Sequence, residues 1–162
     1  MKKFRSPIAD APTISIRLAR PRDREALIPL IRAYYRFDHI RFNPRTLWPA
    51  LDRLLRSRSL GRIWLICDSA CAIGYVVLTY HYDLEFGGIE GLITDLFVEE
   101  AYRGAGLGRR ALDVVDDFCR DRGIRMVELQ VEQDNVVAQE FYRRIGFKPL
   151  TRIVMTRDVR LR

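Results

Sequence analysis

A glycine-rich loop is the first feature of the sequence whose residues could bind a ligand. Gly104, Gly106 and Gly108 follow a hydrophobic stretch and overlap the start of a helical pattern at Leu107. Glycines let the backbone come close to a ligand because no side chain stands in the way. The first N–H groups of a helix lack partners within the helix, so they attract anions. The loop is therefore predicted to be an anion site.

The sequence of the loop narrows the kind of anion. A P-loop would end in Gly-Lys-Ser or Gly-Lys-Thr, and this loop does not, which argues against a nucleoside triphosphate held with Mg²⁺. Gly106 to Ala111 matches the Gly-x-Gly-x-x-Gly/Ala fingerprint of dinucleotide-binding folds, and Glu128 lies about 20 residues further on. That fold needs several βαβ units, and only about 55 residues follow the fingerprint, so the match is weak.

Ionisable side chains near the preceding strand are a second group of candidates. Asp95 is the sole ionisable residue between Leu92 and Val98, so it is expected to be either paired or buried with a raised pKa. A catalytic role and a structural role fit this pattern equally well. His39 and His81 share no metal-ligand spacing, and both are predicted to be solvated histidines.

Asn135 and Tyr142 are a third pair of candidates, because they lie seven positions apart in a predicted helix. They would share one face, two turns and about 10.5 Å apart. One extended ligand could therefore contact both side chains. The alternative for Tyr142 is an ordinary core aromatic next to Phe141.

Hydrophobic patterns predict an α+β fold. Strands are predicted at 14–18, 62–67, 72–82, 89–98, 126–132 and 152–158, and helices at 23–37, 44–56, 107–122 and 135–145. This order indicates a mixed, mostly antiparallel central sheet flanked by helices, in which two parallel strands flank the helix from Leu107. Pro29 is expected to kink or break the first helix. Residues 1–12 are predicted to be a flexible leader and 13–162 a single domain.

Composition limits the class of protein. The 162 residues carry a formal net charge of +7. The sequence has no apolar run of the roughly 18 residues that a membrane span needs. Three cysteines without a Cys-x-x-Cys pair indicate neither a disulfide framework nor a zinc site. A cytoplasmic protein with no membrane partner and no metal is expected. Because basic residues are spread along the chain, a solvated surface is a better interpretation than a nucleic-acid interface.

Two motifs in the second half of the chain carry a resemblance to a known family. The first is Arg103-x-x-Gly106-x-Gly108 after a hydrophobic strand, and the second is Asn135 followed by Phe141-Tyr142-x-x-x-Gly146-Phe147. Together they resemble the GNAT family of acetyl-coenzyme A dependent N-acetyltransferases, over nearly the whole chain. The resemblance implies a fold in which two parallel strands diverge and the cofactor, acetyl-coenzyme A or coenzyme A, inserts between them.

The resemblance also implies which residues contact the cofactor. The loop amides would hold the coenzyme A pyrophosphate, and the preceding strand would pair with the pantetheine arm. The implied cofactor-binding residues are Leu96, Phe97, Val98, Arg103, Gly104, Ala105, Gly106, Leu107, Gly108, Arg109, Asn135 and Tyr142.

Direct transfer of acetyl to a primary amine is the reaction that the resemblance implies. Tyr142 would donate a proton to the departing thiolate, and the backbone N–H near Val98 would stabilise the developing oxyanion. Many relatives carry a Glu as the base at the place where this chain has Gln130, which cannot take a proton. The remaining candidates for the base are Asp95, Glu90 and Glu132, and Asp95 is our catalytic candidate beside Tyr142.

The acceptor is expected to be a cation. Asp95 together with Asp38, in the aromatic-rich stretch 34–42, is similar to the diamine acetyltransferase branch, which holds a cationic acceptor with carboxylates. Asp38, Glu90 and Asp95 are therefore predicted to bind a small cationic amine or a lysine-like side chain. The alternative is a non-catalytic or regulatory GNAT-like domain that binds nucleic acid or another protein through its basic surface. Family habit also suggests a homodimer.

Overall fold

The computed structural model describes residues 13–159, so the leader predicted at 1–12 lies outside the described residues. The chain divides into two compact units, the first ending at Gln130 and the second beginning at Val131. Within residues 13–159, no helix combines the length and the apolar character needed to cross a membrane.

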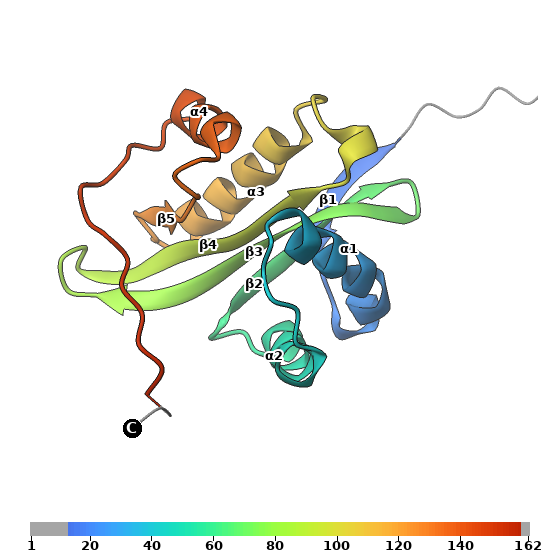
Figure 1. Cartoon of the computed structure of the whole chain (residues 1–162), viewed down its shortest axis with the longest axis horizontal. Helices are drawn as coiled ribbons and strands as arrows, with labels where there is room; N and C mark the ends of the chain where they lie inside the picture. Colours follow the sequence, from blue (N-terminus) through green and yellow to red (C-terminus); the bar gives the residue numbers. More distant parts are fainter. Residues whose placement is uncertain (1–12, 160–162) are drawn as a thin grey trace, which may run out of the picture. The chain divides into compact units, whose positions relative to one another are not determined.

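The first unit contains a five-stranded sheet whose strands follow one another in chain order. The strands are β1 (Ile14–Leu18), β2 (Gly61–Asp68), β3 (Cys71–Asp83), β4 (Gly88–Val98) and β5 (Val127–Leu129). The first three pairings are antiparallel, and only β4 and β5 run parallel. The predicted mixed, mostly antiparallel sheet is therefore confirmed (Figure 1).

Helices cover both faces of this sheet (Figure 1). The helices α1 (Arg24–Phe37) and α2 (Pro44–Arg56) pack on one face, against a core that includes Leu65, Tyr75 and Phe97. The helix α3 (Leu107–Asp121) lies against the other face, where the ring of Phe118 meets that of Trp64 at 5.0 Å. Side chains alternate between the faces along each strand, so the two layers of helices bury opposite sets of residues.

The backbone has two local features that depend on a single proline and a single glycine. The helix α1 is not broken at Pro29, which lies inside a continuous helical segment. One missing hydrogen bond is tolerated there because Leu27, Leu30 and Ile31 are buried on the sheet. A Cβ at Gly74, inside β3, would lie 2.5 Å from the carbonyl oxygen of Phe97. Strands β3 and β4 come this close only because residue 74 has no side chain.

The strand β4 loses its partner on one side halfway along its length. It pairs with β5 only from Gly91 to Ile93, whereas it pairs with β3 as far as Val98. A register shift places Thr94 as an extra residue opposite β3. Among the described strands, none pairs with the β5 side of residues 94–98. The short helix η2 (Glu100–Tyr102) separates this open edge from the glycine loop.

The second unit contains α4 (Val136–Arg144) and an extended tail. The prediction of a strand at 152–158 is wrong, because residues 149–159 form no strand and are exposed. Alternating apolar residues form a strand only where a neighbouring strand supplies hydrogen bonds, and none does so within this unit. The predicted strand at 126–132 is also shorter than expected, since β5 ends at Leu129.

Candidate active site

The glycine loop ends at the N-terminus of α3, which has no side-chain cap. Gly104 and Gly106 have φ angles of 79° and 74°, which residues with a side chain rarely adopt. Gly106 is the N-cap of α3, and no described side chain caps this helix or brings an acidic group to its first turn. A Cβ at either glycine would meet no atom within 4 Å. The unpaired N–H groups and the positive end of the helix dipole therefore face open space.

The residues around these glycines differ in how far they are exposed. Arg103, Ala105 and Arg109 are exposed, whereas Leu107 is buried and anchors the start of α3 in the core. Gly108 is half-buried in the first turn. The loop thus presents backbone and cationic groups to an anion, as a phosphate site requires.

Arg103 joins the loop to the end of β4. Its Nε donates a hydrogen bond of 2.9 Å to the carbonyl oxygen of Val98. Its guanidinium also lies over the ring of Phe37 at the end of α1, 4.4 Å from the ring centre. Cation–π contacts of this kind contribute about 0.5–1 kcal/mol at exposed sites. Arg103 therefore has a positioning role in addition to the anion contact predicted from the sequence.

The open edge of β4 and the loop together fit a long ligand that ends in phosphates. The outer edge of residues 94–98 has no strand partner, although Arg103 binds the carbonyl oxygen of Val98, so the remaining groups on this edge could pair with an amide-bearing arm. The helix N-terminus could accept the anionic end. Phe97 is 6% exposed and belongs to the core. Leu96 and Val98 are half-buried. These residues fit the coenzyme A site that the sequence resemblance implies.

Asp95 lies on the sheet face that packs against α1 and α2. It accepts a hydrogen bond of 2.8 Å from the hydroxyl of Tyr75, which is fully buried. Burial raises the pKa of Asp95, and the nearby charge of Asp38 raises it further, while hydrogen bonds from Tyr75 and Thr94 oppose the shift. Asp95 is thus half-buried with a raised pKa and is also hydrogen-bonded, which combines the two possibilities expected from the sequence.

Aromatic rings surround this carboxylate. The ring of Tyr34 lies 6.4 Å from that of Tyr75 and 6.2 Å from that of Phe97, and its hydroxyl lies 3.3 Å from Asp38 Oδ2. Burial raises the pKa of Tyr35, and the negative charge of Asp95 raises it further. The fold therefore brings Asp38 and Asp95, separate in sequence, into one electrostatic cluster.

A second acidic cluster involves Glu90. Its side chain is 1% exposed, and His81 Nε2 lies 2.9 Å from its Oε2. Neither Glu90 oxygen has a hydrogen bond of good geometry to any described residue. Burial raises the pKa of Glu90, as do the charges of Glu128 and Asp83, against the opposing effect of His81. Donor atoms of His81, Asp83 and Glu90 lie within 4.8 Å of one another, so a cation, either an ammonium or a metal ion, would be stabilised here.

The two acidic clusters lie on the same face of the sheet. Asp95 pairs with Val77 and Glu90 pairs with His81. Because Val77 and His81 are four residues apart on β3, their side chains point to the same side, about 13 Å from each other.

The remaining candidates belong to the second unit. Asn135 is the N-cap of α4, where its side chain accepts a hydrogen bond of 3.1 Å from the N–H of Ala138. This is a capping role that the sequence analysis did not assign to it. Tyr142 is half-buried in α4 and packs against the rings of Phe141 and Phe147 at 5.1 and 5.7 Å. Glu132 is exposed.

The contacts of two residues in these clusters were not predicted from the sequence. Tyr75, the partner of Asp95, looked like one more apolar strand residue. His81 is exposed, as predicted, and it also contacts Glu90, which was not predicted. The hairpin turn between β3 and β4 would have revealed the second pair, because it sets His81 opposite Glu90.

Comparison with known proteins identifies the family of this chain. The model of the acetyltransferase (GNAT) family matches residues 25–147. Aminoglycoside N(6′)-acetyltransferase type 1 of Stenotrophomonas maltophilia is 28% identical, over 93% of this chain and 95% of its own length. Thialysine N-epsilon-acetyltransferase of Bos taurus is 28% identical, over 50% of this chain and 47% of its length. The chain spans about half the length, or less, of the first curated relatives that it matches.

A solved structure has the same fold. Aminoglycoside N-acetyltransferase AAC(6′)-Iy, in complex with CoA, superposes with a TM-score of 0.80 over 94% of this chain and 99% of that protein, at 16% identity. The family model covers most of the chain, and it includes both the glycine loop and α4. This chain therefore belongs to the acetyltransferase (GNAT) family, as its motifs predict.

Proposed function

We propose that this protein is an N-acetyltransferase that transfers acetyl from acetyl-coenzyme A directly to a primary amine of a small cationic molecule or a lysine-like side chain. The observation that carries the proposal is the open edge of β4, which is followed, after η2 and the glycine loop, by the uncapped N-terminus of α3. The family to which the chain belongs supports it.

The loop and the β4 edge bind the cofactor. The N–H groups that begin α3 receive the pyrophosphate, with Arg109 beside them, and the edge at Leu96 to Val98 pairs with the pantetheine arm. Acetyl-coenzyme A supplies an activated acyl group when bound. The backbone N–H near Val98 would then supply a fixed dipole to stabilise the oxyanion that develops during acyl transfer.

Asp95 is the proposed base. A carboxylate whose pKa is raised by burial accepts a proton more readily than an exposed one. Its hydrogen bond from Tyr75 fixes its orientation, and Asp38 draws a cationic acceptor toward it. Proton removal leaves the acceptor nitrogen neutral, which is the form that can attack a thioester.

Tyr142 is the proposed acid, on the strength of the family motif. A thiol and a phenol have ordinary pKa values of about 8.5 and 10, so full proton transfer from Tyr142 to a thiolate costs about 2 kcal/mol. This cost is small compared with a chemical barrier, and a hydrogen bond formed only in the transition state would lower it further.

A molecule with two separated cationic groups suits the sheet face best. One ammonium would lie near Asp38 and Asp95, and another would take the place of His81 against Glu90, about 13 Å away. Relatives named for aminoglycosides and for thialysine act on basic amines by name, which supports this class of acceptor. A place near the diamine acetyltransferase branch remains part of the proposal.

The acceptor class can be tested by thiol release. We expect release of free thiol from acetyl-coenzyme A with diamines, polyamines, aminoglycosides or basic amino acids, because carboxylates at both clusters attract cations. Monoamines that carry no second charge serve as the matched comparison. Turnover of neutral or acidic amines alone would contradict the proposed acceptor.

The cofactor site can be tested with Gly106→Val. A branched side chain at this position would project into the space of the phosphates and strain a backbone with φ of 74°. Calorimetric titration is expected to show loss of coenzyme A binding. Gly123→Val is the control, since Gly123 has a φ of 68°, also has no atom near its Cβ position, and lies at the far end of α3. Equal affinity in both variants would remove the loop from the site.

The acid can be tested with Tyr142→Phe. The loss of one proton donor is expected to lower kcat by about 10²-fold or more, with the affinity for coenzyme A near that of the wild type. Tyr80→Phe is the control, because the Tyr80 hydroxyl is buried without a hydrogen-bond partner among the described residues. Unchanged turnover in Tyr142→Phe would show that another group protonates the thiolate.

The base can be tested through pH dependence. The ratio of kcat/KM between wild type and Asp95→Asn cancels the ionisation of the acceptor, and we expect it to rise with pH through the raised pKa of Asp95. Asp38→Asn removes a like charge, so it should move this rise to lower pH. A ratio that does not change with pH would mean that Asp95 is structural.

A further inference from the structure

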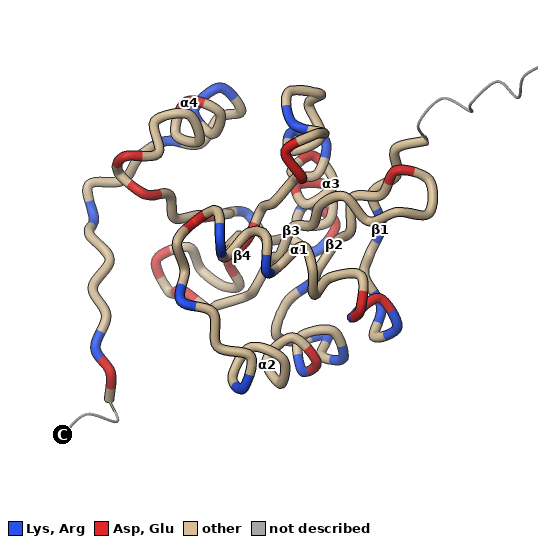
Figure 2. The backbone as a smooth tube through the Cα atoms, turned by 45° about the vertical axis from the view of Figure 1, so that its right-hand side comes forward, with Lys and Arg blue, Asp and Glu red and all other residues tan. Residues whose placement is uncertain are grey.

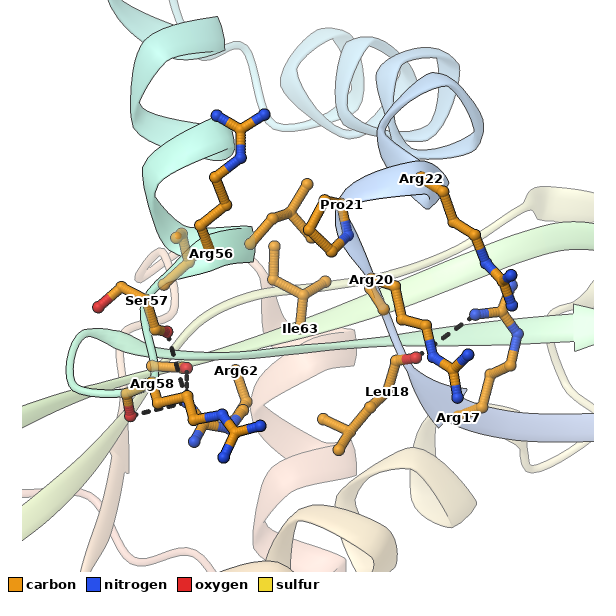
Figure 3. A pocket seen from close by; sticks show the side chains of 14 residues that line it. Arg17, Leu18, Arg20, Pro21, Arg22, Arg56, Ser57, Arg58, Arg62 and Ile63 are labelled. Atoms are coloured by element: carbon orange, nitrogen blue, oxygen red, sulfur yellow. Dashed lines mark hydrogen bonds between the residues drawn. The ribbon is translucent and has the colours of Figure 1, made fainter.

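Arginines from two separate segments meet around one open pocket of about 610 Å³ in the first unit. The pocket lies between the end of β1, the short helix η1 (Pro21–Asp23), the end of α2 and the start of β2. In Figure 3 the arginines stand on two opposite sides, with Pro21 and Ile63 between them. They are Arg17, Arg20, Arg22, Arg56, Arg58 and Arg62.

Most of this positive charge has no acidic partner. Arg17 forms two hydrogen bonds of 2.8 Å with Asp23, and the pKa of Asp23 falls to about 2 as a result. Among the described residues, no carboxylate forms an ion pair with the other five arginines. Figure 2 shows basic positions mixed with acidic ones along much of the backbone, so this concentration of unpaired charge is a local feature.

One arginine of the pocket is held in a fixed orientation. The guanidinium of Arg62 donates to the carbonyl oxygen of Arg58 at 2.8 Å and also to that of Gly61 (Figure 3). It lies near the rings of Phe118 and Tyr80, at 5.7 and 6.0 Å from their centres. A charge fixed by backbone carbonyls loses little freedom when it binds a ligand, which favours binding.

The floor of the pocket is apolar. Pro21, Leu54 and Ile63 contribute to it between the two groups of arginines. Guanidinium groups match phosphate oxygens in geometry and in charge, and an apolar floor favours a flat ring. The volume falls within the range of about 300–1,000 Å³ that small-molecule sites occupy.

We propose that this pocket binds a nucleotide, with its phosphates between the two groups of arginines and its base against the apolar floor. The nucleotide is either free or part of a single strand, since both present the same chemistry. The inference does not depend on the proposed acetyl transfer.

The pocket is separate from the glycine loop. Gly61, which lines the pocket, pairs with Thr79, whereas Val98, which precedes the loop, pairs with Gly74. The two sites are thus at different levels of β3, about 16 Å apart along the strand. A nucleotide in the pocket and a phosphate at the start of α3 would not compete for the same groups.

The test is a calorimetric titration of uridine 5′-triphosphate into the full chain, since its base differs from the adenine of coenzyme A. The variant Arg20→Gln with Arg58→Gln removes one charge from each side of the pocket and should weaken binding at least about tenfold. Arg45→Gln with Arg125→Gln makes the same change of charge at exposed positions outside the pocket, and should alter the affinity less than about twofold. Thermal melts check that both variants fold.

Four results would overturn the proposal. Equal losses in the two double variants would mean general attraction to a basic protein. Full displacement of uridine triphosphate by coenzyme A would assign the binding to the glycine loop. If uridine bound as tightly as its triphosphate, the phosphates would make no contribution to binding. If inorganic triphosphate bound as tightly as the nucleotide, the base would make no contribution.

A single-stranded oligouridylate of about eight residues distinguishes the two sources of the nucleotide. Binding of the strand with higher affinity than the free triphosphate, and with a steep decrease as salt rises, would identify a strand as the ligand. Higher affinity for the free triphosphate would identify a small molecule. The same arginine variant should weaken either one.

Discussion

The structure depends on β4 being paired along its whole length on one side and along only part of it on the other. Beyond Ile93, the backbone groups facing away from β3 have no strand to bind. An unpaired buried N–H or C=O costs free energy, so such an edge persists where water or a ligand can satisfy it. The extra residue at Thr94 bends the strand at the same level. The glycine loop, the start of α3 and Asp95 all take their positions from this strand.

The electrostatics of the site follow from the way the sheet face is covered. The helices α1 and α2 exclude water from the face that carries Asp95, which raises the pKa of that carboxyl. Tyr75 satisfies the carboxylate and limits the shift. Glu90, farther along the same face, is buried with two further acidic groups near it. Both clusters keep negative charge next to apolar surface, where a cationic ligand is attracted more strongly than it would be in water.

Local sequence was enough to predict the order of the elements and the glycine loop, because hydrophobic period and glycine spacing act over a few residues. Features that depend on contacts between residues far apart in the sequence were predicted wrongly or not at all. Residues 152–158 alternate like a strand but form none, since alternation does not supply a neighbouring strand. The contact of Tyr75 with Asp95 and that of His81 with Glu90 depend on the register of β3 and β4, including a bulge that leaves no sequence signal. The arginine pocket joins residues about 40 positions apart, which no local pattern could bring together.

Arg103 contacts two elements, β4 and α1, that are far apart in the sequence. It binds the carbonyl oxygen of Val98 where the loop begins, and it stacks on Phe37 at the end of α1, next to Asp38. Because one guanidinium makes both contacts, a change in its position would alter the end of β4 and the end of α1 together.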